Sequence, residues 1–571
     1  MNEGGMAIIG SLLDRGSSAI PIEINSKEIK LSDLGKKNIL FGIPGSGKTT
    51  AIETIISNVK EQHLSFFYVT YSRAMGKEAR ARIDEHDKSH IGTLHSILSK
   101  ILGWRAGKEG IFLTDEDIEK FCQKYNIKKL KKVRPWEEII SDDMDDDWSQ
   151  FSMAYDKAIN SLKGITEIKN ILQDVNFNPL YIAQKYEEYK NELKKKDYTD
   201  ILIEVERNPE VLPNTDFLFV DEAQDLTPLM WKIITEWSKK AGVVIIAGDD
   251  DQSIYTFKGA DASFFLAQRV NAKIFHLPVS YRVPKEIRDL AVSIISRVKN
   301  REKKNFISVQ DGGVVSQTTS LNEFVHLPGS KYILGRTRYI LEKVSEILIM
   351  EGVPFLPINA RHQSLSPWSE KLIKLTNAIS KFPDVPEEDI IILIENSPAH
   401  IFHRGIKTLA EQGPENIIQK YSQNLEHKFN FKYLLKDQNM TKEQFLNAMN
   451  INPDKKTLIR KYINSGINEE DICYLDTFHA SKGKEADHIA IVLDITQKIF
   501  ENLYTRFEDE YRLLYVAVTR ARKSVNLIYL GLTGMAYDVK VNTNGSRIQQ
   551  GSEKMEVFET KEKSVFSKPD L

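Results

Sequence analysis

Cysteine is nearly absent from this sequence. The 571 residues include two, Cys122 and Cys473, which lie far apart along the chain. Two distant thiols offer no metal-ligand cluster and fit a reducing compartment. Long apolar runs are missing too, and no run is long enough to cross a bilayer. The first residues also lack the regions of a signal peptide. We therefore expect a cytoplasmic protein with no membrane partner.

An excess of one charge sign is also lacking. Lys and Arg number 78 and Asp and Glu 80, which gives a net charge of −2. No overall positive field attracts nucleic acid, so any such site must be local. The length and the 41% hydrophobic content suffice for several packed domains. No internal repeat at a fixed period is present.

A glycine-rich stretch at 41–50, FGIPGSGKTT, fits the phosphate-loop pattern. Glycines let backbone N–H groups turn towards phosphate oxygens, where a Cβ would interfere. Lys48 is placed to reach the β- and γ-phosphates, and Thr49 to bind Mg²⁺. A strand pattern at 36–41 precedes the loop and a helical pattern follows, as in phosphate sites at helix N-termini. The predicted phosphate-binding residues are Gly42, Gly45, Ser46, Gly47, Lys48, Thr49 and Thr50.

An apolar strand pattern at 216–222 ends in Asp221 and Glu222. A carboxylate at the end of a strand can hold Mg²⁺, which we predict for Asp221. The adjacent Glu222 can act as general base towards the attacking water. An ordinary acidic turn is the alternative, and the phosphate loop upstream makes it less favoured.

Strand patterns alternate with helical patterns over much of the chain, which predicts an α/β fold with parallel sheets. Two polar, helix-rich stretches interrupt the alternation, and the first contains an acidic run at 142–147 that predicts a solvated loop, with metal binding as the weaker alternative. The predicted organisation is a first lobe at 1–99 and 198–272 with a helical insertion at 100–197, a second lobe at 273–361 and 469–537 with a helical insertion at 362–468, and a flexible tail at 538–571.

Four further stretches carry a family resemblance. They are DEAQD at 221–225, GDDDQSIY at 248–255, HASKGKEAD at 479–487 and VTRAR at 518–522. With the phosphate loop they resemble, in order, the motifs of superfamily 1 DNA helicases of the UvrD/Rep/PcrA type, over residues 40–530. The resemblance implies two RecA-like lobes, each with a helical insertion. It also implies an ATP- and Mg²⁺-dependent motor that moves on single-stranded DNA and at duplex junctions, from 3′ to 5′.

The resemblance assigns roles around the nucleotide. Gln252 would sense the γ-phosphate, and Arg282 and Arg520 would reach it from the second lobe. Tyr281 would stack on the adenine and Glu485 would contact the ribose. Taken alone, each arginine would be interpreted as half of a surface ion pair. The order of the motifs favours the catalytic interpretation.

The resemblance also implies a path for DNA. Single strands are held by aromatic stacking and phosphate contacts, and Phe257 lies where the family has a stacking aromatic. Phe257 as a plain core residue is the alternative. The predicted DNA-binding residues are Thr70, Arg73, Thr93, His95, Tyr255, Phe257, Thr477 and His479.

The sequence departs from the family at several places. Residues 1–47 contain no glutamine, whereas the family carries one upstream of the phosphate loop that reads the adenine edge. This predicts weak discrimination between ATP and other purine triphosphates. Lys484 and Ala486 replace an apolar residue and Phe, and the second insertion is shorter than in the larger relatives.

Two other functions remain open. The first is a nucleic-acid-stimulated ATPase without autonomous unwinding, acting as motor subunit beside a partner such as a nuclease in a larger or phage-defence complex. The second is a binding or scaffold protein with a dead nucleotide site. The second requires a missing catalytic residue, yet Lys48, Asp221, Glu222 and Arg520 are all present.

Overall fold

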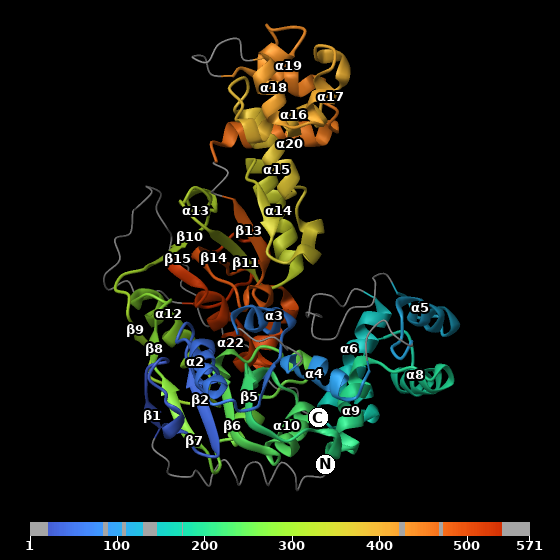
Figure 1. Ribbon diagram of the computed structural model, residues 1–571, viewed down its shortest axis with the longest axis vertical. Coiled ribbons are helices and arrows are strands. Elements are labelled where there is room, and N and C mark those ends of the chain that lie inside the picture. The colour runs from blue at the N-terminus through green and yellow to red at the C-terminus, as the bar shows by residue number, and fades with distance from the viewer. Residues whose placement is uncertain are drawn as a thin grey trace, which may run out of the picture.

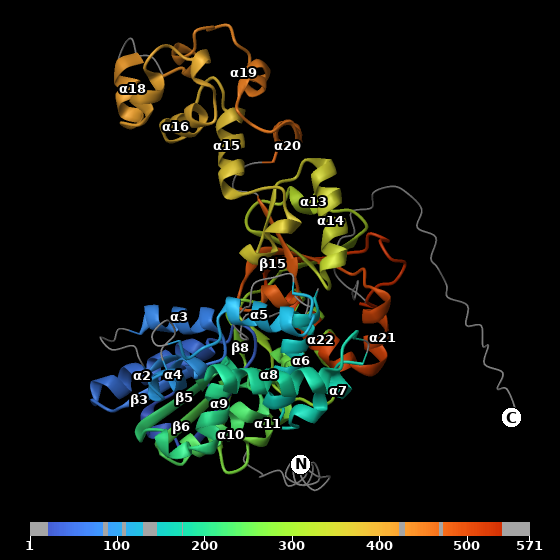
Figure 2. The ribbon, with the colours of Figure 1, turned by 90° about the vertical axis from the view of Figure 1, so that its right-hand side faces the viewer.

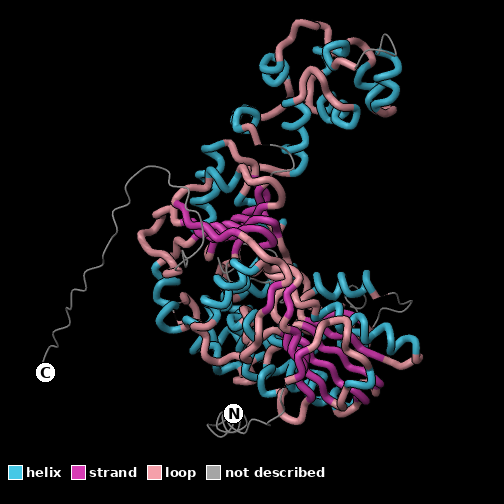
Figure 3. The backbone as a smooth tube through the Cα atoms, turned by 90° about the vertical axis from the view of Figure 1, so that its left-hand side faces the viewer, coloured by secondary structure: helices cyan, strands magenta, loops and turns pink. Residues whose placement is uncertain are grey.

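The structure is a computed structural model that describes residues 21–83, 90–104, 110–129, 146–173, 175–421, 429–467 and 472–539. Two parallel sheets form two lobes, one above the other, and a group of helices extends from each lobe (Figure 1). The tube in Figure 3 shows the strands as two separate groups. The predicted α/β class, with two RecA-like lobes that each carry a helical insertion, is confirmed.

The first sheet has seven strands in the order β1-β7-β2-β6-β5-β3-β4, and its named pairs are parallel. Its central strands are apolar and buried, as expected where helices cover both faces of a parallel sheet. The strands are β1 (Ile22–Glu23), β2 (Lys37–Gly42), β3 (Phe66–Thr70), β4 (Ile91–Thr93), β5 (Thr215–Asp221), β6 (Ala241–Gly248) and β7 (Lys273–Leu277).

The prediction that the second lobe begins at residue 273 is wrong at this strand. β7 pairs in parallel with β2, with Phe275 opposite Leu40, and it belongs to the first sheet. Its apolar pattern predicts a buried strand but carries no information about its neighbours. Sheet membership is set by pairing with β2, more than 200 residues earlier in the chain.

Helices cover the first sheet and begin at polar caps. The side chains of Ser72, Thr93 and Thr227 each accept a hydrogen bond from a backbone N–H of the first turn. The helices are α2 (Lys48–Glu61), α3 (Arg73–Arg82), α4 (Leu94–Ile101), α9 (Tyr198–Arg207), α10 (Pro228–Ser238) and α11 (Ala262–Ala267).

The first insertion is a helical unit with its own apolar core. Phe121, Phe151 and Tyr186 are buried together at its centre. Its helices are α5 (Asp115–Lys124), α6 (Asp147–Asn160), α7 (Ile168–Ile171) and α8 (Pro179–Leu193). Of the acidic run, Asp146 caps α6 and Asp147 begins it, while 142–145 lie outside the described residues.

The second sheet has six parallel strands in the order β10-β15-β14-β11-β13-β12. They are β10 (Val314–Thr318), β11 (Lys331–Gly335), β12 (Phe355–Pro357), β13 (Cys473–Thr477), β14 (Ala486–Val492) and β15 (Ala521–Ile528). The accompanying helices are α12 (Lys285–Ile295), α13 (Asn322–Val325), α14 (Arg338–Glu351), α21 (Gln497–Thr505) and α22 (Phe507–Val518). A short ladder of β8 (Val279–Ser280) and β9 (Ile307–Ser308) lies where the chain passes from β7 to this lobe.

The second insertion projects from the far side of the second lobe (Figures 1 and 2). Phe382, Phe431 and Phe445 form its aromatic core. Its helices are α15 (Glu370–Ser380), α16 (Glu387–Glu395), α17 (Ile406–Ala410), α18 (Pro414–Tyr421), α19 (Lys442–Ala448) and α20 (Pro453–Ser465). Among the described helices, none combines the length and the apolar character that crossing a bilayer requires. The predicted tail, from 540 onward, lies outside the described residues.

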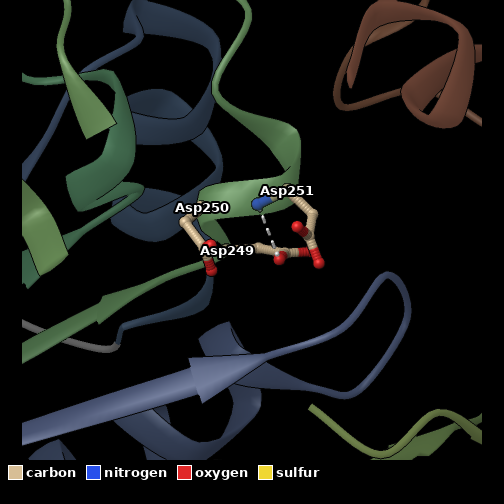
Figure 4. A group of neighbouring side chains, drawn as sticks. All are labelled: Asp249, Asp250 and Asp251. Atoms are coloured by element: carbon tan, nitrogen blue, oxygen red, sulfur yellow. Dashed lines mark hydrogen bonds between the residues drawn. The ribbon is translucent and has the colours of Figure 1, made fainter. Parts of the chain in front are cut away.

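A buried charge cluster joins the two lobes. Asp249, Asp250 and Asp251 follow β6 of the first lobe, and their carboxylates gather closely (Figure 4). The Nζ atom of Lys304, from the segment between α12 and β9, lies 2.8 Å from Asp249 Oδ1 and 3.1 Å from Asp251 Oδ2, and it also contacts Asp250. Arg301 adds a two-pronged pair to Asp251, at 2.7 and 2.6 Å. These cations compensate the buried carboxylates, so the cluster is a joint between lobes.

We expect Lys304→Met to destabilise the protein, because it removes the ammonium that contacts all three buried carboxylates. Breaking a buried ion pair costs about 3–5 kcal/mol. Thermal unfolding of the purified protein measures the effect, with Lys303→Met, an exposed neighbour, as the control. Equal Tm values for the two variants would show that the cluster does not stabilise the fold.

Candidate active site

The phosphate loop connects β2 to α2 and is wrapped around Lys48. Gly45 and Gly47 have φ of +72° and +79°, which side chains rarely adopt. A Cβ on Gly42 would fall 2.4 Å from Lys48 Cγ. The Lys48 ammonium donates to the carbonyl oxygens of Gly42 at 3.0 Å and Ile43 at 3.3 Å. The loop is therefore folded with its lysine directed inward.

The loop fits a phosphate group. The Ser46 hydroxyl is buried and has no hydrogen-bond partner among the described residues. Buried polar groups normally have a partner, and a phosphate oxygen would supply one. The N-terminus of α2, whose N-cap is Gly47, adds unpaired backbone donors and the positive end of the helix dipole.

Asp221 closes one side of the loop at the end of β5. Tyr68 donates to its Oδ2 at 2.6 Å, and the Thr49 hydroxyl lies 3.4 Å from the same oxygen. Complete burial, followed by the charge of Glu222, raises the pKa of Asp221 to about 6. A carboxylate and a hydroxyl oxygen are hard ligands, so these residues fit Mg²⁺.

Glu222 occupies the next position, with a left-handed backbone at φ +51°. Non-glycine residues seldom adopt this region, and such strain is concentrated at functional sites. Gln224 donates to the Glu222 carboxylate and accepts from the backbone N–H of Asp249 at 3.0 Å. Gln224 thus connects the ends of β5 and β6.

The second lobe contributes Arg520 to the same cleft. Its guanidinium is 2% exposed and donates to Gln252 Oε1 at 3.0 Å. Gln252 in turn donates to Asp249 Oδ2 at 2.6 Å. Burial, followed by the charge of Arg282, lowers the pKa of Arg520 to about 9. A desolvated cation of this kind is stabilised when an anion enters the cleft.

Arg282 and Glu485 form a second charged group. The Glu485 carboxylate pairs with both Arg282 and Arg522. Tyr281 is 50% exposed, and its backbone N–H donates to Gly45 O at 3.0 Å. The second lobe therefore contacts the phosphate loop directly. In this conformation Glu485 pairs with Arg282, which is predicted to reach the γ-phosphate.

Most of the predicted residues line one cleft of about 930 Å³ between the lobes, whereas Gly42 and Asp221 are buried and are not part of its lining. The predicted nucleotide residues on its wall are Gly45, Ser46, Gly47, Lys48, Thr49, Thr50, Glu222, Gln252, Tyr281, Arg282, Glu485 and Arg520.

Sequence reasoning missed two residues in this cleft. Lys482 Nζ pairs with Asp225 and donates to the Gln252 carbonyl oxygen at 2.8 Å. Burial raises the pKa of Asp225 to about 7. Both belong to motifs that were identified, HASKGKEAD and DEAQD, but a pairing across 257 positions has no signal in the sequence.

Tyr255 and Phe257 are neighbouring aromatic residues that line different cavities. Tyr255, predicted to bind DNA, lines the nucleotide cleft, where its ring stacks on Tyr71 with centroids 5.3 Å apart. Phe257 lines a separate cavity of about 990 Å³, bounded by the first insertion and by α21 and α22. His479 lies in the same cavity, with its ring 5.4 Å from that of Phe257. The structure thus brings Phe257 and His479 together in one cavity, and Tyr255 contacts the Phe257 ring from the nucleotide cleft, with centroids 6.0 Å apart.

The other predicted DNA residues divide into two groups. Arg73, Thr93 and His95 line a third cavity, of about 590 Å³, which also contains the stacked rings of Phe112 and Tyr198. The side chains of Thr70 and Thr477 are fully buried, so neither is exposed to a strand in this conformation. Thr477 accepts from the backbone N–H of Ala480, which fits support of the loop rather than contact.

Comparison with known proteins agrees with this geometry. Residues 25–273 match the family described as the UvrD/REP helicase N-terminal domain, and residues 473–528 match the UvrD-like helicase C-terminal domain. A probable DNA helicase II homolog of Mycoplasma pneumoniae is 24% identical, over 89% of this chain and 84% of its own length. The ATP-dependent DNA helicase PcrA of Staphylococcus epidermidis is 23% identical, over 85% and 80%. The ATP-dependent DNA helicase Rep of Buchnera aphidicola is 24% identical, over 85% and 91%.

The two matched regions contain the phosphate loop, Asp221 and Glu222 at one end of the chain and Arg520 at the other. The structure gathers the phosphate loop, Glu222 and Arg520 in one cleft between two parallel-sheet lobes, with Asp221 buried beside Thr49. This chain therefore belongs to the UvrD/Rep family of helicases.

Proposed function

We propose that this protein is an ATP-dependent DNA helicase that moves from 3′ to 5′ on single-stranded DNA and separates strands at duplex junctions. One observation carries the proposal. The segment from Asp249 to Lys258 presents Gln252 to the nucleotide cleft and Phe257 to the neighbouring cavity. A change at the nucleotide therefore has a path of five residues to the side chain proposed to stack on DNA.

Different residues of the cleft have different roles in ATP hydrolysis. Lys48 and the backbone N–H groups of the loop hold the phosphates, and Glu222 accepts a proton from the attacking water. Arg282 and Arg520 neutralise charge that develops on the γ-phosphate. Thr49 and Asp221 would hold Mg²⁺, which when bound neutralises phosphate charge.

Two pairings must change when a nucleotide enters. Arg520 donates to Gln252, and Arg282 pairs with Glu485. In our proposal both arginines turn to the γ-phosphate. This movement releases Gln252 Oε1 from Arg520 and draws the lobes together. Release of phosphate restores the original pairs, and this cycle of closing and opening drives the motor.

The cavity around Phe257 has the chemistry of a single-strand site. An aromatic face provides stacking, and cationic side chains provide phosphate contacts. Burial, followed by the charge of Arg506, lowers the pKa of Lys157 in this cavity. Crowded cations are stabilised by an anionic backbone, so we propose that the strand passes here. The third cavity, with Arg73 and the ring of Tyr198, would extend the same path.

Two measurements on the isolated protein test this function. ATPase rate is measured with and without single-stranded DNA or RNA, and strand displacement is measured on duplexes with 3′ or 5′ tails. We expect stimulation by single strands and displacement of 3′-tailed duplexes. Stimulation without displacement would instead support a motor subunit that needs a partner such as a nuclease, and absence of both would reject a motor.

Glu222→Gln should bind nucleotide with nearly unchanged affinity and lose turnover, because only the proton acceptor is neutralised. Single-turnover hydrolysis and equilibrium nucleotide binding separate the two effects. Glu236→Gln, on the surface of α10, is the matched control. Near-normal turnover in Glu222→Gln would rule out its role as general base.

Arg520→Ala should lower kcat strongly and change nucleotide affinity modestly, because the guanidinium acts mainly in the transition state. Removing such an arginine costs about 10³–10⁵ in rate. Arg288→Ala, at the exposed Asp289 pair of α12, is the control. A similar loss of rate in the control would indicate a general effect on folding.

Phe257→Ala should keep basal ATPase activity, require more single-stranded DNA for stimulation, and unwind fewer base pairs per ATP. Losing one aromatic stack costs about 1–3 kcal/mol of single-strand binding. Phe257→Trp should be tolerated, because it enlarges the stacking face. A wild-type unwinding yield per ATP in Phe257→Ala would make Phe257 a packing residue.

A further inference from the structure

Among the described residues upstream of the phosphate loop, none that lines the nucleotide cleft carries a side-chain amide. Residues 1–47 contain no glutamine, and the described residues that precede the phosphate loop and line the cleft are Ser26 and Lys27. Selecting one purine over another requires a group that distinguishes their edges, and such a group can come from another segment of the cleft.

Gln310 lies in this cleft, directly after β9 in the second lobe. Its backbone is tied to the segment that carries Tyr281. Val309 N–H donates to Ser280 O at 3.1 Å, and Lys285 N–H donates to Gln310 O at 3.1 Å. Its side-chain amide donates to the carbonyl oxygen of Tyr281 at 3.2 Å. Gln310 is therefore held at the backbone of Tyr281, the residue whose ring is proposed to stack on the base.

The bond to Tyr281 determines which way the amide of Gln310 faces. An amide has two N–H groups and one oxygen. One N–H is used by the Tyr281 carbonyl, and turning the amide over would set two acceptor oxygens against each other. The second N–H and Oε1 remain as a donor and an acceptor on one edge.

That edge is complementary to adenine. Adenine presents N7 as acceptor and its N6 amino group as donor, and a glutamine amide can bond both. Guanine presents N7 and O6, both acceptors, so its O6 would face Gln310 Oε1 without a hydrogen between them. The other glutamine that lines the cleft in the described part of the chain, Gln252, already pairs with Asp249 and Arg520.

We propose that Gln310 reads the purine edge of the nucleotide and selects ATP over GTP, in place of the absent upstream glutamine. The proposal rests on the proposed function, because it takes Tyr281 as the stacking partner of the base. The missing upstream glutamine predicts weak purine discrimination. In this proposal the protein instead selects ATP, through a residue of the second lobe. Base reading then requires the second lobe to be docked on the phosphate loop, as Tyr281 N–H is on Gly45 O.

The test compares kcat/KM for ATP, GTP and 7-deaza-ATP in the full-length protein, with single-stranded DNA present. Wild type should prefer ATP over GTP, and Gln310→Ala should lower that ratio by about 10- to 100-fold, the value of a bidentate base contact. 7-deaza-ATP has carbon in place of N7, so its kcat/KM should be lower than that of ATP in the wild type. In Gln310→Ala the two nucleotides should have similar kcat/KM values. Gln317→Ala, an exposed glutamine on β10, is the matched control.

Gln310→Arg supplies a gain of function that misfolding cannot imitate. Arginine offers two donors to guanine O6 and N7, so this variant should raise kcat/KM for GTP relative to wild type. An unchanged ATP/GTP ratio in Gln310→Ala, or no purine preference in wild type, would overturn the role of Gln310 while leaving the motor intact. Absence of hydrolysis of either nucleotide by wild type would instead reject the proposed function.

Discussion

The ion cluster around the buried ammonium of Lys304 fixes the segment through which we propose that the nucleotide and DNA sites are coupled. The ammonium neutralises three adjacent carboxylates at the end of β6 and ties them to the chain that leads into the second lobe. Asp249, one of these carboxylates, also accepts from the Gln252 amide. The start of the segment shared by the nucleotide cleft and the Phe257 cavity is thus fixed by charges that water cannot screen. Because the segment from Asp249 to Lys258 is fixed at its start, a shift of Gln252 would move Phe257 more than it would in a free loop.

Electrostatics around the cleft fit a polyanionic ligand. Lys48 is 9% exposed, and its ammonium donates to the backbone carbonyl oxygens of Gly42 and Ile43. Arg520 is buried and donates to the neutral oxygens of Val516 and Gln252. Folding has already removed most water from these cations, so an entering phosphate chain meets donors that need little reorganisation. The raised pKa of Asp221 reflects the same burial acting on a carboxylate, and a divalent cation would relieve it.

In our proposal, base selection and hydrolysis both require residues of the second lobe. Arg520 and Gln310 come from different segments of that lobe, yet both line the cleft whose floor is the phosphate loop of the first lobe. A nucleotide is therefore recognised at both ends only when the lobes are together. This arrangement connects recognition, chemistry and lobe closure through one interface.

Much of this site was determined by sequence alone, because its parts are neighbours in the chain. The phosphate loop needs only the glycines, Lys48 and Thr49 in register between β2 and α2, and Asp221 and Glu222 follow directly from the apolar strand β5. The α/β class and the two helical insertions also follow from local alternation of strand and helix patterns. Such features depend on spacing, and spacing is visible in a sequence.

Only the tertiary structure decided the remaining features. Four features depend on contacts between distant segments: the sheet that β7 joins, the three carboxylates around Lys304, the stacking of Tyr255 on Tyr71, and the bond from Gln310 to Tyr281. An apolar pentapeptide such as β7 is equally compatible with either sheet, and a lysine or glutamine in a polar stretch is equally compatible with solvent. Packing decides among these possibilities, because one arrangement of the segments buries the most apolar surface. Each charge or amide buried in that arrangement must then be hydrogen-bonded or ion-paired.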